Sequence, residues 1–391
     1  MIYTFDSTQV GAPVLSGTAG ALATVLKSCL VDGFGAGAVV SLVVTAGIAK
    51  ATYSATHPFR VGSIGRFAGA TPAALNGDQA ILSVTANTAT FAAPGVPDGA
   101  ATGSITSRAA PAGWQELFPG LANVLVLKPS AVEASGCLLQ LDDTGATAAR
   151  VVGYEGMTSN TTGVGAFPAE AQYSGGMYWP KSDVASGAAR AWRLMADRQA
   201  LHLWLAPQGT GQQHGVLFTF GDLVADKSGD AYACLLSGGS AGTAATAGAV
   251  PGCLGYGHAT AAGADCFVPR AATGLGSAQL ARKTAAYNCG PGYAGTAAYN
   301  ANALPYPNQA DNSLRLAPLD VLVGTNGFRG RVAGVHHSPQ VLGDAFATGD
   351  LVVGTGAYAA RNMLALRVGP PGAALAAAGV VFVDVTGPWR T

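Results

Sequence analysis

Ser240 stands in a pattern that serine hydrolases use to present a nucleophile. The segment Gly238-Gly239-Ser240-Ala241-Gly242 fits G-x-S-x-G, and Asp265 or Asp320 and then His336 follow in the hydrolase chain order. A catalytic serine needs a strand-to-helix turn that holds its hydroxyl clear beside a base. The Thr/Ala/Gly run after Ser240 predicts no such helix, and the chain holds 55 glycines. We therefore interpret the match as chance and predict no enzyme activity.

A second pattern has the spacing of a dinucleotide-binding loop. Gly290, Gly292 and Gly295 match G-x-G-x-x-G, which should follow an apolar strand and open a helix. The flanking residues 284–289 and 296–300 suit neither element, so a loop is predicted.

Two pairs of adjacent residues have side chains of the kind that bind metal ions in other proteins. Neighbouring residues on a strand point to opposite faces, so His336 and His337 would not converge on one ion. The carboxylates of Asp142 and Asp143 meet the same objection, and the Thr-Gly that follows them favours a turn. No metal and no cofactor is predicted.

None of the six cysteines has the short C-x2-4-C spacing of a metal knuckle. The favoured interpretation is small, buried, reduced thiols, since cytosolic thiols rarely pair. Pairing after exposure to an oxidising exterior stays open for the four late cysteines, Cys234, Cys253, Cys266 and Cys289.

Aromatic side chains cluster in the middle of the chain. Such a group forms either a platform that stacks on sugar rings or a partner chain, or part of a core or subunit interface, which is the commoner use. The residues concerned are Tyr173, Tyr178, Trp179, Trp192 and Trp204.

The composition excludes several classes of function. Charged residues make up 11% of the chain, with 21 basic and 21 acidic residues scattered along it, so binding to nucleic acid is disfavoured. A hydrophobic content of 49% is ample for a core and argues against disorder. No segment has the apolar density of a membrane span or the pattern of a secretory signal, so we expect a soluble product of the cytoplasm without membrane insertion. Near-neutrality gives little colloidal repulsion and favours an assembly.

The sequence predicts one amphipathic helix. Over residues 17–31, Leu22, Val25, Leu26, Cys29 and Leu30 form one apolar stripe. Ser16 or Thr18 is expected to cap its start and Gly33 to end it. The window 276–287 is a weaker helix candidate.

Most of the remaining chain predicts short strands between Gly, Asn and Pro turns. Residues 38–45 and 48–54 form a hairpin across Ala46-Gly47, and the strands that follow up to residue 92 make a small barrel or sandwich. Residues 191–205 alternate on both sides of a polar break, which favours a hairpin over a helix. One face of that hairpin would place Trp192, Leu194 and Ala196 opposite Leu201, Leu203 and Leu205.

Long Gly/Ala-rich loops are expected at 237–250 and 287–303. Strand character returns at 321–323, 351–353, 363–368 and 380–385.

Several strings resemble a family of uncharacterised tailed-bacteriophage virion proteins, over nearly the whole chain. They are residues 8–20 (TQVGAPVLSGTAG), 146–155 (ATAARVVGYE), 175–181 (GGMYWPK), 220–222 (FGD), 227–232 (KSGDAY) and 384–389 (DVTGPW). A second resemblance, to a small β module of phage tail and fibre proteins, is carried by 57–62 (HPFRVG), 75–77 (LNG) and 102–106 (TGSIT) and covers about 70 residues. Neither resemblance brings a known active site.

The sequence predicts a mainly-β fold: a β-sandwich or barrel domain with one N-terminal helix and a small inserted β-barrel module. Residues 1–37 would form the helix-containing segment, 38–107 the module and 108–391 the main domain. The resemblance implies a virion structural protein, assembled in the host cytoplasm and located in the tail, baseplate or neck. It would act as a symmetric multimer whose partners are its own copies and other virion proteins. Two alternatives stay open: a receptor-binding appendage that recognises a host surface glycan, and a capsid decoration protein.

Overall fold

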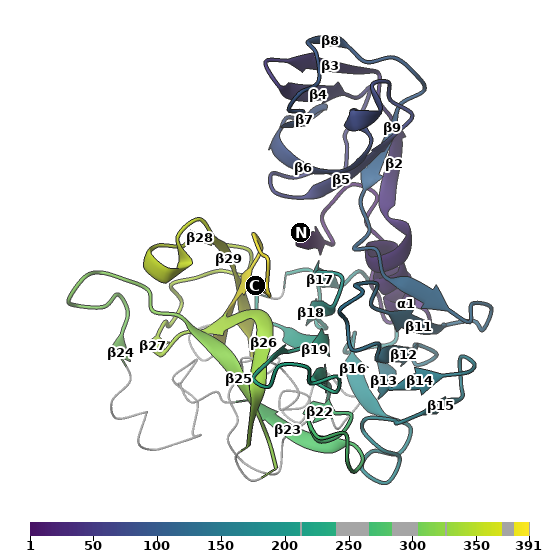
Figure 1. Cartoon of the computed structure of the whole chain (residues 1–391), viewed down its shortest axis with the longest axis vertical. Coiled ribbons are helices and arrows are strands. Elements are labelled where there is room, and N and C mark those ends of the chain that lie inside the picture. The colour runs from purple at the N-terminus through teal and green to yellow at the C-terminus, as the bar shows by residue number, and fades with distance from the viewer. Residues whose placement is uncertain (212, 240–265, 284–303, 325–326, 370–378, 391) are drawn as a thin grey trace.

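The computed structural model describes residues 1–211, 213–239, 266–283, 304–324, 327–369 and 379–390. The fold is mainly β with one α-helix near the N-terminus, as the sequence predicts (Figure 1). Of the two predicted Gly/Ala-rich loops, 287–303 lies outside the described residues, and so does 237–250 except for its first three residues.

The largest sheet contains 13 strands, and all the pairs along its path are antiparallel. Its strands, in spatial order, are β1 (Tyr3–Asp6), β17 (Ala191–Ala196), β18 (Ala200–Ala206), β19 (Val216–Asp222), β21 (Cys234–Ser237), β22 (Cys266–Val268), β23 (Gln279–Lys283), β25 (Ala317–Val323), β26 (Gly327–His337), β30 (Gly379–Asp384), β29 (Asn362–Val368) and β28 (Leu351–Val353), with β20 (Val224–Ala225) paired to β26. The two ends of this path are therefore β1 and β28.

This sheet curls until strands from its two halves meet. Gly215, just before β19, forms a parallel bridge with Val368 at the end of β29. The Nε2 of His202 on β18 lies 2.8 Å from the carbonyl oxygen of Ala333 on β26. Every residue of β18 and β19 is buried as a result, which explains their nearly continuous apolar sequences.

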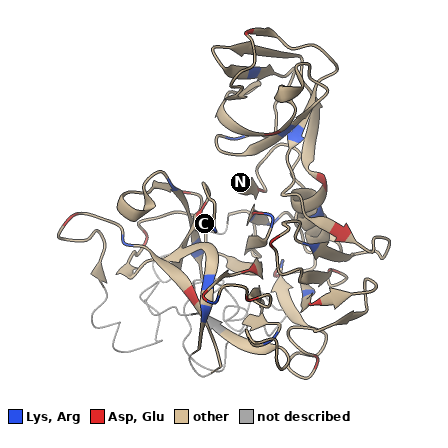
Figure 2. Ribbon diagram, viewed as in Figure 1, with Lys and Arg blue, Asp and Glu red and all other residues tan. Residues whose placement is uncertain are grey.

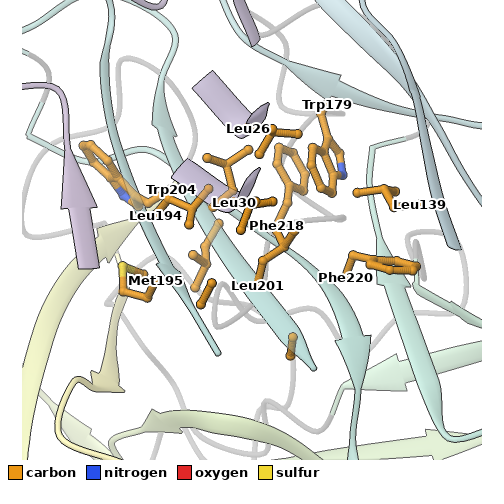
Figure 3. Packing of buried hydrophobic residues seen from close by; sticks show 14 of the residues in the cluster. Leu26, Leu30, Leu139, Trp179, Leu194, Met195, Leu201, Trp204, Phe218 and Phe220 are labelled. Atoms are coloured by element: carbon orange, nitrogen blue, oxygen red, sulfur yellow. The ribbon is translucent and has the colours of Figure 1, made fainter. Parts of the chain in front are cut away.

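A second sheet of five strands covers the other side of β17, β18 and β19. Its strands are β10 (Gln115–Leu117), β11 (Val124–Lys128), β12 (Leu138–Asp142), β13 (Ala148–Tyr154) and β16 (Met177–Pro180). Figure 3 shows the packing between these layers, where Trp179 lies against Phe218 and Leu139 lies near Phe220. The rings of Trp179 and Phe218 are stacked, with centroids 5.7 Å apart.

The predicted helix is present as α1 (Ala21–Lys27) followed by one π turn (Ser28–Asp32). The predicted apolar stripe is fully buried, and Gly33 ends the helical segment with φ of 78°. The predicted cap is wrong. Gly20 precedes the helix in a left-handed conformation without a side-chain cap, and the hydroxyls of Ser16 and Thr18 hydrogen-bond to each other instead.

Residues 34–109 contain a small barrel. Its strands, in spatial order, are β2 (Phe34–Ala38), β9 (Thr106–Ala109), β5 (Ile64–Ala68), β6 (Gly77–Val84), β7 (Thr88–Ala92), β4 (Ile48–Thr52), β3 (Ser41–Thr45) and β8 (Gly99–Ala100), with a 3-10 turn at Ala73–Leu75. The chain pairs with β9 along β2 and with β4 along β3, and it changes partner between Val39 and Val40. The N–H of Val39 still donates to Ile105, next to β9, whereas the N–H of Val40 donates to Thr52 of β4. Because β2 and β3 are consecutive in the chain, this change of partner closes the barrel.

The barrel has its own core, separate from that of the larger body. The predicted hairpin across Ala46-Gly47 is confirmed, and both turn residues have positive φ as a two-residue turn of this kind requires. Figure 1 shows the barrel standing at one end of the long axis of the molecule. The assignment of residues 38–107 as a separate module stays a prediction.

Further predictions are confirmed in the large sheet. Residues 191–206 form the β17–β18 hairpin, and its register pairs Trp192 with Leu205, Leu194 with Leu203 and Ala196 with Leu201, as expected. The late strands are β25, β28, β29 and β30. The helix predicted at 276–287 is wrong, because residues 279–283 form β23 between β22 and β25. Pairing in the sheet overrides a weak helical pattern there.

The remaining short elements are β14 (Gly156–Met157) paired with β15 (Gly163–Val164), β24 (Leu304–Pro305) paired with β27 (Gln340–Val341), and a 3-10 turn at Gly356–Tyr358. In the described part of the chain, no helix is long and apolar enough to cross a membrane.

Candidate functional site

The three tryptophans of the predicted aromatic group lie in the core. Trp179 and Trp192 are fully buried and Trp204 is 2% exposed. Trp192 pairs with Leu205, one residue beyond Trp204, so the two indoles point to opposite faces of the sheet. Each indole N–H donates to a main-chain carbonyl: that of Ser237 for Trp179, Pro13 for Trp192 and Arg367 for Trp204. These residues hold layers together and present no stacking face.

The two tyrosines of the group are partly exposed and lie apart from each other in their contacts. Tyr178 lies under the guanidinium of Arg150, 3.9 Å from its ring centroid. Tyr173 packs edge-on against Phe267. The structure therefore does not bring the five aromatics together on one surface.

Asp143 has a role that its sequence position gives no sign of. Its Oδ2 accepts the N–H groups of Leu22 and Ala23 at 2.7 and 3.0 Å, which caps α1 from 120 residues away. Its Oδ1 pairs with the ammonium of Lys181, and both side chains are fully buried. Burial raises the pKa of Asp143 and lowers that of Lys181. The predicted turn begins at Asp142, whose Oδ1 accepts the N–H of Thr144.

The histidine pair lies near the end of β26. Burial lowers the pKa of both rings, to about 4 for His337, and His336 packs edge-on against Tyr358. Among the described residues, no three His, Cys, Asp or Glu side chains are grouped for a metal ion.

The four cysteines that the structure describes are all buried, as the favoured interpretation expects. The free thiols are Cys29, Cys137 and Cys234, and Cys266 is also buried. Cys253 and Cys289 lie outside the described residues, as do Ser240 and the glycine pattern at 290–295.

Two neighbouring cavities of about 550 and 570 Å³ share Glu133, Gln199 and Arg390 in their walls. The carboxylate of Asp222 in the second cavity accepts the N–H and hydroxyl of Ser135, and burial raises its pKa. Arg390 pairs with Asp197 at 2.6 Å. The carboxylate of Asp222 is therefore hydrogen-bonded to Ser135, and that of Asp197 is paired with Arg390.

A third cavity, of about 250 Å³, lies where the barrel meets the two ends of the large sheet. We call it the junction cavity. Its wall includes Thr4 of β1, Val61 of the barrel, Arg193 of β17 and Leu351 of β28. Val61 is 65% exposed and Leu351 is 60% exposed. The wall thus combines aliphatic side chains with the edges of two strands.

On β1 and on β28, the main-chain N–H and C=O groups of alternate residues point away from the neighbouring strand of the sheet. Gly354 donates to Arg361, so the antiparallel alternation turns the N–H and C=O groups of Leu351 and Val353 away from β29. Ser7 donates to Trp192, and the same alternation turns those of Thr4 away from β17. Within the described ranges, no hydrogen bond reaches these groups of Thr4, Leu351 or Val353.

The wall of the junction cavity contains two arginines, Arg60 and Arg193, and one carboxylate, that of Asp6. Asp6 pairs with Arg60 and also accepts the N–H and hydroxyl of Thr8. The guanidinium of Arg193 comes no closer to that carboxylate than 3.6 Å, and the Arg193 side chain makes no hydrogen bond within the part of the chain that the structure describes. Its side chain is only 25% exposed, and burial lowers its pKa. Two guanidinium groups therefore share one carboxylate.

No protein-family model matches this chain, and no curated protein matches it in sequence.

Proposed function

We propose that this chain is a structural component of a tailed-bacteriophage virion, in the tail, baseplate or neck. It would act by assembling with its own copies and with other virion proteins. The resemblance of its sequence strings to phage virion proteins supports the class. The mainly-β architecture, with a barrel carried at one end of a larger body, is compatible with that class.

The observation that carries the proposal is the outer edge of β28, which pairs with no strand in the described part of the chain. Soluble proteins protect such edges with charges, prolines, bulges or a covering segment, because an open edge templates pairing with another chain. Here the outward residues are Leu351 and Val353, which are 60% and 72% exposed. An aliphatic edge of this kind is a surface for another polypeptide.

The charge distribution agrees with a protein that works in an assembly. Figure 2 shows Lys, Arg, Asp and Glu as isolated positions along a largely uncharged chain. The formal net charge is zero, so little repulsion opposes the close approach of copies.

The alternatives differ in how the structure bears on them. A glycan-binding appendage would need exposed aromatic faces, and the burial of Trp179, Trp192 and Trp204 gives it no support. A capsid decoration protein could use the same strand edge, so the position of the copies in the particle distinguishes it from a tail part.

The test is the protein content of purified virions from a phage that encodes the chain. We expect mass spectrometry to find the polypeptide at a fixed copy number set by the rotational symmetry of its ring or shell. Labelling of intact particles with an antibody would then separate a tail position from a head position. Absence of the polypeptide from purified virions would contradict the proposal.

A further inference from the structure

The junction cavity joins three features that point to one kind of occupant. It lies between the two ends of a curled sheet, β1 and β28, and the barrel loop that contains Val61 forms another wall. Among the strands that the structure describes, the sheet path stops on both sides of the cavity without pairing across it.

The first feature is the supply of open main-chain groups. Leu351 on one side of the cavity and Thr4 on the other direct N–H and C=O groups away from their sheet partners, and Val353 does so further along the same edge as Leu351. A chain in extended conformation satisfies such groups by adding a strand to the edge, as in β-augmentation. A compact small molecule would not match the regular spacing of main-chain N–H and C=O groups along a strand edge.

The second feature is the aliphatic lining. Val61 and Leu351 are largely exposed, and Met195 and Leu364 are buried in the wall behind them. Alternate side chains of a strand point to the same face, so an added segment would place aliphatic residues two positions apart against this lining.

The third feature is Arg193. Its guanidinium lines the cavity, is three-quarters buried and makes no hydrogen bond within the described residues. The main chain of Gly349 lies so close that a Cβ there would stand 2.6 Å from Nη2, which limits where the guanidinium can move. A carboxylate on a ligand would accept a charge-assisted hydrogen bond from this guanidinium.

We propose that the junction cavity binds an extended segment of a different virion protein, a segment with alternating aliphatic residues and one carboxylate. The segment pairs with the open edge of β28 and places its carboxylate on Arg193. The identity of the donor as a virion protein rests on the proposed function, whereas the binding chemistry can be tested on the purified chain alone.

The test uses a fluorescein-labelled peptide, Gly-Val-Thr-Val-Glu-Val-Gly, and fluorescence anisotropy with the full-length protein. A second peptide carries Lys in place of Glu. A charge-assisted hydrogen bond contributes about 1.5–3 kcal/mol, so we expect the Lys peptide to bind at least about tenfold more weakly. This comparison needs no protein variant and is independent of folding defects.

Protein variants locate the binding. Leu351→Lys places a charge on the edge of β28 and is expected to lower the affinity for the Glu peptide at least about tenfold. Leu275→Lys is the matched control, because Leu275 is similarly exposed, at 72%, and does not line the cavity. Arg193→Gln is expected to remove the preference for Glu over Lys, with circular dichroism and thermal unfolding as checks on its fold.

Equal affinities for the two peptides, no binding of either at millimolar concentration, or unchanged binding by Leu351→Lys would each overturn the inference. Dimerisation of the wild-type chain that Leu351→Lys abolishes would also overturn it, because the occupant would then be a second copy. None of these outcomes bears on whether virions contain the polypeptide, so failure of this inference and failure of the proposed function are distinguishable.

Discussion

His202 makes the stability of the large sheet sensitive to acid. Its ring is fully buried between β19 and β26, where Nε2 lies 2.8 Å from the carbonyl oxygen of Ala333 and Nδ1 lies 2.8 Å from the hydroxyl of Thr219. A carbonyl can only accept, so Nε2 carries the proton. When the ring is neutral, Nδ1 therefore accepts the hydroxyl hydrogen of Thr219, and the carbonyl oxygen of Leu201, also 2.8 Å from that hydroxyl, is the competing acceptor. Burial lowers the pKa of His202 from 6.5 to about 4.

The size and sign of the effect follow from linkage. The folded pKa lies below the unfolded one, so the stabilisation is fully present above about pH 6.5 and is lost as the pH falls towards about 4. Each tenfold change in proton affinity corresponds to about 1.4 kcal/mol. The shift of His202 therefore predicts a loss of about 3 kcal/mol of unfolding free energy across that window.

The assay compares the wild-type chain with His202→Gln by urea unfolding at several pH values between about 7.5 and 4. The Gln amide nitrogen can replace the Nε2 donor to Ala333 but does not titrate. Other acid-sensitive groups, such as His337 and Asp78, are present in both proteins and cancel in the difference. We expect the difference in unfolding free energy to shrink by about 3 kcal/mol on acidification. A difference that stays constant with pH would refute the reasoning.

Three further changes test the packing. Asp143→Asn leaves the buried ammonium of Lys181 unpaired and should cost about 3–5 kcal/mol; adding Lys181→Met should restore much of this, and strictly additive losses in a double-mutant cycle would contradict the pairing. Trp179→Ala should cost about 3–5 kcal/mol of unfolding free energy, because the indole is fully buried; a variant with wild-type thermal stability would show that the indole is not a core residue. Gly334→Ala should cost at least about 1–3 kcal/mol, because φ is +71° and the new Cβ would lie 2.2 Å from Nε1 of Trp389; an unchanged near-UV circular dichroism spectrum and midpoint would argue against this clash.

The parts of the fold that the sequence predicts well are those with a local signal. The stripe of α1 and the register of the β17–β18 hairpin follow from the periods of helix and strand, which are set within 15 residues or so. The turn at Ala46-Gly47 is also local. These patterns survive because the core buries the faces that they define.

The parts that the sequence does not predict depend on partners far along the chain. Asp143 caps α1 and pairs with Lys181 across long stretches of sequence, and no spacing rule connects them. The aromatic group shows the same limit, because buried and exposed tryptophans have the same sequence signature. The junction cavity is built by β1, the barrel loop and β28, which only the closed topology brings together.

The two strands that connect the barrel to the rest of the chain, β2 and β9, have a consequence for how such a protein can change. Phe34 of β2 is paired directly with Ala109 of β9, and paired positions on antiparallel strands lie about 4.5–5.5 Å apart. The host chain is therefore interrupted by more than 70 residues while its two cut ends remain neighbours. A short linker across that gap would delete the barrel as a cassette, and a different domain whose termini are adjacent could be grafted in its place.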